Sequence, residues 1–474
     1  MKFFFETYGC QMNLAESAAL ALAARERGWE EAEDAGEADL VLINTCSVRE
    51  TAERRIRGRL AHYAALKKKR DKPFTLVMAG CMAQRLEARL REDFPAVDFV
   101  MGTSARSRFP LILEAAEHGP SFGSARFAGL TDAAGFIETG EKPVFSFSSV
   151  HFDTAGESPF RSFVPIMHGC NNFCSYCIVP YVRGREVSRS PGAILEEIRL
   201  VGEKGIREIT LLGQNVNSYA WEGDFGLPAW AIPPGGLKAG KLDFPSLLEL
   251  IARNLDSMAG GVRWVRFLSS HPKDLSPRAI EVMAEFPVFC RHIHLCVQHG
   301  SNRILTAMNR RYSREQYLEL VAALRSAMPG ISLTTDILIG FPGETGEDLD
   351  ETLSLMEEVK FLYAYMYHYN PREGTAAFEL PDRVAEEVKR ERLSRVIALQ
   401  KRHTSELLRS RVGKEATVLI EGISRKNADE LISRTERDEM VVVPGDSALL
   451  GAFVKCSLLS LRGNTFRAGV MELL

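Results

Sequence analysis

The sequence predicts an α/β protein made of three consecutive parts. We expect an N-terminal α/β domain with a parallel sheet at 1–118, a linker at 119–155, a central partial (β/α) barrel at 156–406 and a small all-β barrel at 409–474. Strands alternate with helices in two separate blocks, and short strands alone fill the last block. Alternation of this kind is typical of parallel sheets, whereas closely spaced short strands indicate a barrel or sandwich.

The first block contains four apolar runs of strand length, separated by helical stretches. The runs are KFFFETYGC (2–10), ADLVLINTC (38–46), FTLVMAGC (74–81) and VDFVMGT (97–103), and the helical stretches include AESAALALAARERG (15–28) and RETAERRIRGRLAHYAALKKKRD (49–71). Nearly continuous apolar runs are expected for strands that are buried on both faces of a parallel sheet. The following GPSFGSARFAGLTDAAGFIETGEKP (119–143) is rich in glycine and small polar residues, which favours a linker.

The second block repeats strand and helix six times, which predicts a closed or partly closed barrel. Its strand candidates are FVPIMHG (163–169), REITLLGQN (207–215), WVRFLSS (264–270), HIHLCVQ (292–298), LTTDILIGF (333–341) and AYMYHYN (364–370). AWEGDFGLPAWAIPPGGLKAG (220–240) interrupts the repeat, and its glycines and prolines predict a loop insertion.

A charged helical stretch at 383–410 ends the second block and short strands follow it. These are EATVLIEGI (415–423), MVVVPG (440–445), AFVKCSLLSL (452–461) and TFRAGVMEL (465–473), which together predict a small all-β barrel.

The bulk composition is that of a water-soluble protein. Hydrophobic residues make up 45% and the net charge is −3, so the chain is not basic throughout, although a local basic face is compatible with that total. The sequence contains no uninterrupted apolar run long enough to span a membrane and no signal peptide, so we expect a cytoplasmic protein without membrane association. An odd count of nine cysteines favours thiols and metal ligands over a disulfide framework.

Cys170, Cys174 and Cys177 form a C-x3-C-x2-C motif just after the first strand of the expected barrel. A four-iron cluster held by protein alone takes four thiolates, so three leave one iron open to an outside ligand. A zinc site completed by His168 is the alternative, but zinc sites favour paired C-x2-C motifs and this segment has one.

This motif, with Tyr176 before its last cysteine, resembles the radical S-adenosylmethionine (SAM) superfamily. The resemblance implies a [4Fe–4S] cluster whose open iron is chelated by SAM, which is then cleaved to a 5′-deoxyadenosyl radical.

Cys10, Cys46 and Cys81 form a second triad, because each ends a predicted strand of the first block. The carboxyl ends of parallel strands meet at one edge of a sheet, so the three thiols are expected to converge. Three structural core cysteines are the alternative.

The segments around both triads resemble the radical SAM methylthiotransferase family, and most closely its MiaB branch. The similar segments are TYGCQMN, NTCSVRE, GCMAQR, GCNNFCSYCIVPYVRGRE, LLGQNVNSY, SSHP, RYSREQYL and DILIGFPGET, which span nearly the whole chain. The resemblance implies a transferase for tRNA processing that methylthiolates C2 of N6-(dimethylallyl)adenosine at position 37 of tRNA anticodon loops. It further implies two SAM molecules, a second [4Fe–4S] cluster on the first triad, and a sulfur donor and an electron donor of unknown identity.

Three alternatives remain open at this point. Sister enzymes of the family act on threonylcarbamoyl adenosine of tRNA or on an aspartate of a ribosomal protein. A non-catalytic iron–sulfur protein that binds RNA is the third. TYGCQMN favours the branch that acts on prenylated adenosine.

Other residues are weaker candidates. Gln298 and Gly340 are expected to contact the cofactor, although Gly340 and Gly343 also suit a plain turn. Cys296 and His299 stand where the MiaB branch usually has proline and serine, and both could lie beside the SAM pocket. We expect Cys290, Cys296 and Cys456 to be core cysteines.

Two stretches could contact RNA. The last block resembles a TRAM domain, an RNA-binding barrel whose basic surface would be formed by Lys414, Arg425, Lys426, Arg434, Arg437, Lys455, Arg462 and Arg467. The basic run Arg54, Arg55, Arg57, Arg59, Lys67, Lys68, Lys69 and Arg70 is either a solvated helix face or a phosphate contact, and Arg183, Arg185 and Arg189 are candidates for an anionic substrate.

Overall fold

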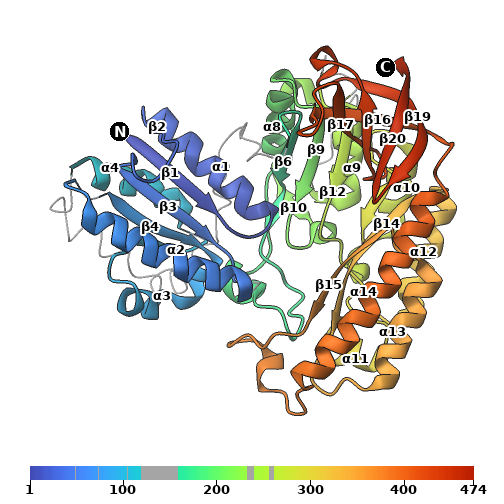
Figure 1. The fold of residues 1–474 in the computed structure, drawn as a ribbon, viewed down its shortest axis with the longest axis horizontal. Helices are drawn as coiled ribbons and strands as arrows, with labels where there is room; N and C mark the ends of the chain where they lie inside the picture. Colours follow the sequence, from blue (N-terminus) through green and yellow to red (C-terminus); the bar gives the residue numbers. More distant parts are fainter. Residues whose placement is uncertain (48–49, 73, 104, 119–157, 232–239, 256–260) are drawn as a thin grey trace. The chain divides into compact units, whose positions relative to one another are not determined.

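The computed structural model describes the chain except for residues 48–49, 73, 104, 119–157, 232–239 and 256–260 (Figure 1). The expected linker at 119–155 therefore lies outside the described residues. The chain divides into two compact units that interleave in sequence: 1–155, 167–171 and 177–187 form the first, and 156–166, 172–176 and 188–474 form the second. In the described part of the chain, no helix has the length and apolar character needed to cross a membrane.

The first unit contains a five-stranded parallel sheet in the order β2-β1-β3-β4-β5. The strands are β1 (Lys2–Thr7), β2 (Glu30–Glu31), β3 (Leu40–Thr45), β4 (Thr75–Gly80) and β5 (Phe99–Met101). The helices are α1 (Gln11–Glu26), α2 (Glu50–Lys69), α3 (Cys81–Asp93) and α4 (Phe109–His118), with η1 (Arg106–Arg108) before α4. All four predicted strands are present, and the two-residue β2 was not foreseen.

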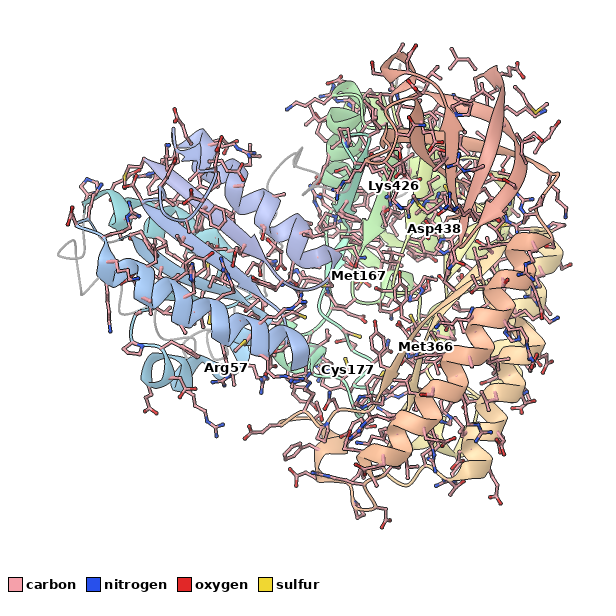
Figure 2. The ribbon with its side chains drawn as sticks, viewed as in Figure 1. Arg57, Met167, Cys177, Met366, Lys426 and Asp438 are labelled. Carbon is pink, nitrogen blue, oxygen red and sulfur yellow. The ribbon has the colours of Figure 1, made fainter. Side chains whose placement is uncertain are left out.

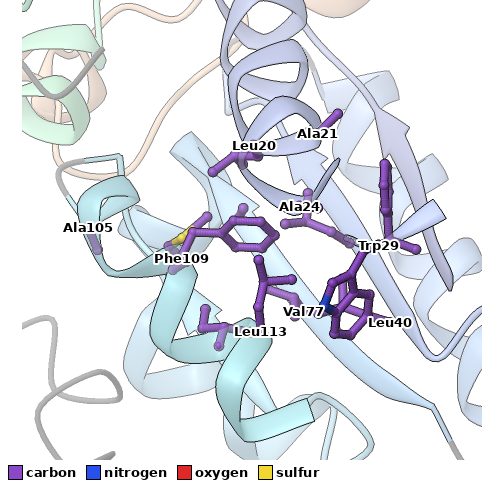
Figure 3. Packing of buried hydrophobic residues seen from close by; sticks show 14 residues of the cluster. Leu20, Ala21, Ala24, Trp29, Leu40, Val77, Ala105, Phe109 and Leu113 are labelled. Carbon is purple, nitrogen blue, oxygen red and sulfur yellow. The ribbon is translucent and has the colours of Figure 1, made fainter. Parts of the chain in front are cut away.

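Two hydrophobic cores cover the two faces of this sheet. On one face, Leu40 and Leu42 of β3 pack with Leu20 of α1 and Phe109 of α4 (Figure 3). On the other face, Val41 and Ile43 of β3 pack with residues of α2 and α3, such as Ile56, Leu60, Tyr63 and Met82. Alternate residues of one strand point to opposite faces, so a strand buried on both faces must be apolar throughout.

The second unit contains six parallel barrel strands in two sheets, with the orders β12-β9-β6 and β13-β14-β15. They are β6 (Arg161–Pro165), β9 (Glu208–Leu212), β12 (Trp264–Phe267), β13 (His292–His294), β14 (Ser332–Ile339) and β15 (Tyr363–His368). A backbone bridge between Val265 and Phe289 joins the two sheets. Each predicted barrel strand is present, and the expected partial barrel is confirmed.

Helices connect these strands, and several of them begin after a serine or threonine whose side chain caps the first turn. They are α8 (Pro191–Glu203), α9 (Phe244–Leu255), α10 (Pro277–Glu285), α11 (Asn302–Ala307), α12 (Arg314–Ala327), α13 (Gly346–Val359) and α14 (Glu386–Arg409). Ser313 and Thr345 cap α12 and α13 through reciprocal capping boxes, which satisfy backbone N–H groups that a helix start leaves open. Short 3₁₀ turns lie at η2 (Val216–Ser218), η3 (Ala229–Ala231), η4 (Pro272–Asp274), η5 (Ala376–Glu379) and η6 (Ser447–Leu449).

The predicted insertion at 220–240 is partly ordered. Its ends form an antiparallel pair, β10 (Ala220–Gly223) and β11 (Gly240–Asp243), so the expectation of a plain loop is wrong for these residues. Near the cysteine motif lie the short pair β7 (Met167–His168) and β8 (Val187–Ser188), and the helix α7 (Val179–Arg183).

The last part of the chain is a closed barrel in the order β16-β17-β18-β20-β19. Its strands are β16 (Glu415–Ile423), β17 (Glu430–Thr435), β18 (Met440–Pro444), β19 (Phe453–Arg462) and β20 (Thr465–Leu473). Val418, Val441, Val454 and Phe466 are buried in its centre. The sequence analysis missed β17, although ELISRT alternates polar and apolar residues, as is typical of a strand with one buried face.

This barrel packs on the amino ends of the central barrel strands within the second unit. Arg161 at the start of β6 and Arg266 of β12 both pair with the buried Glu208, at 2.8 and 3.0 Å. Arg266 also donates to the backbone carbonyls of Thr435 and Glu436 in the C-terminal barrel, at 2.8 and 2.9 Å. The C-terminal barrel therefore does not cover the carboxyl ends of the strands, where ligands bind in such barrels.

Candidate active site

The first cysteine triad lies at the carboxyl edge of the sheet in the first unit. Cys10 is the N-cap of α1, Cys46 directly follows β3 and Cys81 is the first residue of α3. Their strands β1, β3 and β4 are neighbours in the sheet, so the chain brings the three thiols to one place. Cys46 and Cys81 are buried and Cys10 is exposed.

Glycine precedes two of these cysteines because the backbone around them is crowded. Gly80 has φ +93°, and a Cβ there would lie 2.5 Å from the carbonyl oxygen of Thr45. Gly9 has φ +143°, and a Cβ there would lie 2.9 Å from the Cβ of Cys46. The glycine–cysteine pairs thus allow the strand ends to approach closely.

Asn13 connects the parts of this triad. Its side-chain oxygen accepts a hydrogen bond from the thiol of Cys10 at 3.3 Å. Its Nδ2 donates to the carbonyl of Thr45 at 3.0 Å and to the side chain of Asn44 at 3.1 Å. Asn13 therefore fixes the start of α1 against the end of β3.

A buried group of charged side chains lies next to the triad. Arg183 donates to Glu16 at 2.6 Å and to Asn13 at 3.1 Å, and Arg106 also pairs with Glu16. All three charged side chains are at most 9% exposed, so this pocket buries two guanidiniums against one carboxylate. Because isolated buried charge is costly, the surplus positive charge suits an anionic occupant.

The pKa shifts follow from this arrangement. Burial raises the pKa of the Cys81 thiol to about 12, while the charge of Arg183 opposes the shift. Burial acts to lower the pKa of Arg183, but the nearby Cys81 and Glu16 raise it well above its usual value. Burial and the two arginines lower the pKa of His168 to about 4, so this histidine is neutral.

The segment after the C-x3-C-x2-C motif packs onto this triad in the first unit. Ile178 and Val182 form an apolar cluster with Cys81. The backbone N–H of Cys170 donates to the carbonyl of Gly184 at 3.2 Å, within the same unit. The chain that follows Cys177 (labelled in Figure 2) therefore carries Arg183 to the other cysteine triad.

The middle of the motif belongs to the second unit, where Arg310 holds it. Arg310 donates from Nη1 to the sulfur of Cys174 at 3.3 Å and from Nη2 to the carbonyl of Cys296 at 2.6 Å. Asn309 donates to the carbonyl of Phe173 at 2.8 Å, and Ser175 donates to that of Ala307. The turn 307–311 is thus a support for the motif loop.

The three predicted cofactor residues lie around the carboxyl ends of β13 and β14. Tyr176 packs against a cluster that contains Phe341, the residue after Gly340. Gln298 has φ +69°, and its backbone bonds to Asp336 and Leu338 of β14 at 2.9 and 2.8 Å. Gly340 has φ +68°, and a Cβ there would lie 2.5 Å from Cγ of Lys389. The close approach of Lys389 thus explains why residue 340 is a glycine. Contact of Tyr176, Gln298 and Gly340 with the cofactor stays a prediction.

Strained backbone gathers on the same side of the barrel. Of the eight described non-glycine residues with positive φ, five lie in the motif loop, in the turn that supports it or after barrel strands: Phe173, Ser269, Gln298, Asn309 and Arg311. Such conformations are costly and tend to occur at functional sites. The carboxyl side of the barrel is therefore the candidate active face.

Three family models match the chain along its length. They are "Radical SAM superfamily" at 164–356, "Uncharacterized protein family UPF0004" at 2–102 and "TRAM domain" at 409–470. A protein from Treponema pallidum named tRNA-2-methylthio-N(6)-dimethylallyladenosine synthase is 48% identical, over 100% of this chain and 99% of its own length. The chain belongs to the same family of radical SAM methylthiotransferases.

Relatives from other bacteria carry the same name. The protein from Treponema denticola is 48% identical over 99% of this chain and 100% of its own length. The protein from Geobacter sulfurreducens is 41% identical over 96% and 94%. Among solved structures, the radical S-adenosylmethionine methyltransferase TsrM from Kitasatospora setae has a TM-score of 0.56 at 14% identity, over 80% of this chain and 77% of that one. It shares the fold with this methylthiotransferase.

The structure corrects several predictions about basic residues of the methylthiotransferase. Arg183 and Arg189, two of the candidates for an anionic substrate, are buried, and Arg189 pairs with Glu197. Arg434 pairs with Asp438 at 2.6 Å and Arg437 with Glu439 at 3.6 Å, inside the junction between the two barrels. Lys414, Arg425, Lys426, Arg462 and Arg467 are exposed (Lys426 and Asp438 are labelled in Figure 2).

The basic helix α2 is partly neutralised within its own domain. Arg59 pairs with Glu6 at 2.5 Å, Arg57 with Asp93 at 3.3 Å, and Lys67 with Asp98. These pairs favour a solvated helix face over a phosphate contact.

The remaining cysteines and His299 have different surroundings. Cys456 lies in the centre of the C-terminal barrel and Cys290 beside Trp264 and Phe453, as expected for core residues. His299 is fully buried, and its Nε2 lies 3.2 Å from Glu344. Cys296 departs from the expectation of a core cysteine, because it is only partly buried and lies close to His294 and Asp336.

Sequence reasoning missed the charged residues of this site. Arg310 directly precedes the quoted RYSREQYL segment, Glu16 lies in the helical stretch 15–28, and Arg106 lies in a segment for which no element was expected, so none of the three had a motif to single it out.

Proposed function

We propose that this chain methylthiolates C2 of N6-(dimethylallyl)adenosine at position 37 of tRNA anticodon loops, with two SAM molecules. The relatives named tRNA-2-methylthio-N(6)-dimethylallyladenosine synthase, which match over nearly the full length, support this substrate. Both cysteine triads that the family resemblance implies are present in the chain. The similarity over the full length to relatives of that name is the observation that carries the proposal, and the surplus positive charge buried beside the cysteine triad Cys10, Cys46 and Cys81 supports an anionic group there.

We propose two [4Fe–4S] clusters, one on Cys10, Cys46 and Cys81 and one on Cys170, Cys174 and Cys177. Three thiolates and a cluster form an anionic group, which the guanidiniums of Arg183 and Arg106 suit. When bound, the clusters supply radical generation from SAM and hold the sulfur to be inserted, which side chains alone cannot do.

The chain itself positions these groups. Arg310 fixes the Cys174 loop to the end of β13, and its donation to the sulfur strengthens as the thiol becomes a thiolate. Asn13 orients Cys10, and Arg183 neutralises charge near Cys81. Tyr176, Gln298 and Gly340 are proposed to contact SAM at the carboxyl ends of β13 and β14.

The exposed cations of the C-terminal barrel are proposed to hold tRNA. Lys414, Arg425, Lys426, Arg462 and Arg467 offer phosphate contacts, although Arg467 also pairs with Glu430 at 2.6 Å. The target base would turn out of the anticodon loop to react, since chemistry on a base requires access to its ring. An electron donor, a sulfur donor and a cytoplasmic location belong to the same proposal.

The domain boundaries of the proposal are 1–118, 156–406 and 409–474, with a linker at 119–155. The three family matches, at 2–102, 164–356 and 409–470, support them.

Nucleoside mass spectrometry of tRNA from cells that lack this protein tests the substrate. We expect loss of the 2-methylthio group with the prenyl group retained. Loss of the thiomethyl group from threonylcarbamoyl adenosine or from a ribosomal protein instead would select a sister reaction and contradict the proposal.

Iron analysis tests the second cluster. Cys46→Ala should lower the iron content of reconstituted protein from about eight to about four per chain and abolish thiomethylated product. Cys456→Ala, which removes a core thiol outside both triads, is the control and should keep about eight. Anaerobic incubation with SAM and a reductant should yield 5′-deoxyadenosine, which a non-catalytic RNA-binding protein would not form.

A further inference from the structure

Three side chains of different chemistry meet inside the central barrel. His294 ends β13, Cys296 follows two residues later, and Asp336 lies in the middle of β14. One ligand atom from each lies within 4.8 Å of the others, and Nε2 of His294 is 3.5 Å from a carboxylate oxygen of Asp336. Neighbouring parallel strands bring these residues together, since His294 pairs with Thr334.

The ring of His294 is held in the orientation that a metal ligand needs. Its Nδ1 bonds to the hydroxyl of Thr334 at 3.0 Å, which leaves Nε2 directed at Cys296 and Asp336. The ring of Tyr365, on β15, packs edge-on at 5.6 Å. Metal-binding histidines in proteins typically have their second nitrogen fixed by a hydrogen bond in this way.

We propose that His294, Cys296 and Asp336 bind a divalent transition-metal ion of the zinc class, at a site separate from both cysteine triads. Imidazole, thiolate and carboxylate are the ligands that Zn²⁺ takes, and three of them leave a fourth position open. The thiolate and the carboxylate together balance the charge of the ion.

Arg310 lies near this site but bonds to other groups. Arg310 donates to the backbone carbonyl of Cys296 and to the sulfur of Cys174, and to the hydroxyl of Tyr312 at 3.0 Å. Arg310 also connects the proposed metal site to the loop of the C-x3-C-x2-C motif.

The competing arrangement is a metal-free ion pair in the same place. Burial acts to lower the pKa of His294, but Cys296 and Asp336 raise it well above its usual value. A protonated His294 would then bridge the thiol and the carboxylate. A zinc-binding measurement distinguishes the proposed metal site from this ion pair, because only the metal site retains zinc.

The test uses full-length protein with its iron–sulfur clusters, exposed anaerobically to zinc chloride and then dialysed. We expect about one zinc per chain, with one sulfur neighbour at about 2.3 Å and nitrogen or oxygen neighbours at about 2.0–2.1 Å by X-ray absorption at the zinc edge. Cys296→Ala and Asp336→Asn should each retain at least about tenfold less zinc, while Cys456→Ala should retain the full amount.

Three results would overturn the proposal: no zinc retained, zinc with three sulfur neighbours, or retention unchanged in Cys296→Ala. The second result would place the zinc on a cysteine triad. Thr334→Val provides a second variant that keeps all three ligands and removes the hydroxyl that bonds to Nδ1 of His294 and to Nε2 of His292, both at 3.0 Å; it should weaken zinc retention. The proposal does not rest on the proposed function, because zinc is counted without tRNA or SAM.

Discussion

The guanidinium of Arg183 is buried although it carries a full charge. It reaches Glu16 and Asn13, which come from a helix 167 and 170 residues earlier in the chain. Because Arg106 already pairs with Glu16, one carboxylate cannot neutralise both arginines. The uncompensated positive charge of Arg183 therefore stabilises negative charge on a group bound by the cysteine triad.

Replacement of Arg183 should change the reduction potential of a cluster on the first triad. In a Cys174→Ala background, which removes a ligand of the other cluster, Arg183→Met should shift the potential to a more negative value. A buried positive charge favours the reduced, more negative state, and its loss disfavours reduction. Arg183→Lys keeps the charge and should restore most of the potential, as measured by redox titration with electron paramagnetic resonance.

Arg189→Met is the matched control for this experiment, because Arg189 is equally buried but pairs with Glu197 within the second unit. Equal potentials in Arg183→Met and Arg189→Met would show that Arg183 has no electrostatic role there.

At the scale of elements, the ends of the barrel strands are shaped by local capping. His271 lies between β12 and η4 and accepts a hydrogen bond from the backbone N–H of Lys273 at 3.2 Å. It is 6% exposed, and burial together with Arg310, Lys273 and Arg311 lowers its pKa to about 2. The histidine is therefore a neutral cap of the turn that follows β12.

This cap predicts a pH dependence of stability. Below the unfolded pKa of about 6.5, the unfolded chain binds a proton that the folded His271 does not, so stability falls as the pH decreases toward 2. The slope from this group approaches about 1.4 kcal/mol per pH unit. His271→Asn keeps an acceptor for the cap and should remove this contribution.

Denaturant unfolding between pH 7.5 and pH 5.5 measures the difference in slope between the two proteins. Parallel curves for the natural chain and His271→Asn would contradict the assignment of a depressed pKa to His271.

At the scale of the whole molecule, the second unit joins two barrels through a buried ionic network. Glu208 is fully buried and forms ion pairs with Arg161 and Arg266. Arg161 also lies 3.7 Å from Glu421 of the C-terminal barrel. Trp264 stacks edge-on with Phe453 across the same junction, at 4.9 Å. The amino side of the central barrel is thus closed by the last domain.

Glu208→Gln should loosen this junction. The substitution leaves the buried Arg266 without its carboxylate and leaves the partly buried Arg161 with only Glu421, at 3.7 Å, which costs about 3–5 kcal/mol of unfolding free energy. Trp264 fluorescence during denaturant unfolding should report an earlier transition than in the natural chain. Glu222→Gln removes an exposed carboxylate that lies 3.8 Å from Lys241 and should change the free energy by less than about 1 kcal/mol. Equal midpoints in both variants would argue against a role for Glu208 in docking.

Sequence reasoning succeeded where a local pattern has one physical solution. Apolar runs such as LVLINT and TLVMAG are typical of buried parallel strands, and they are β3 and β4. It missed β17, although the alternation in ELISRT is typical of a half-buried strand, and β17 pairs with β16 and β18. It failed for β10 and β11 because their glycines are usual in loops.

The sequence by itself determined the three-part fold and the two cysteine triads, because thiol spacing and strand ends are local properties of the chain. Only the tertiary structure decided which charged side chains lie beside those triads. It also decided that a third group of potential metal ligands, His294, Cys296 and Asp336, comes together. Arg183 finds Glu16, and His294 finds Asp336, through contacts between residues that are far apart in the chain. A charged residue in sequence is expected at the surface, and nothing local tells when folding will bury it beside a partner.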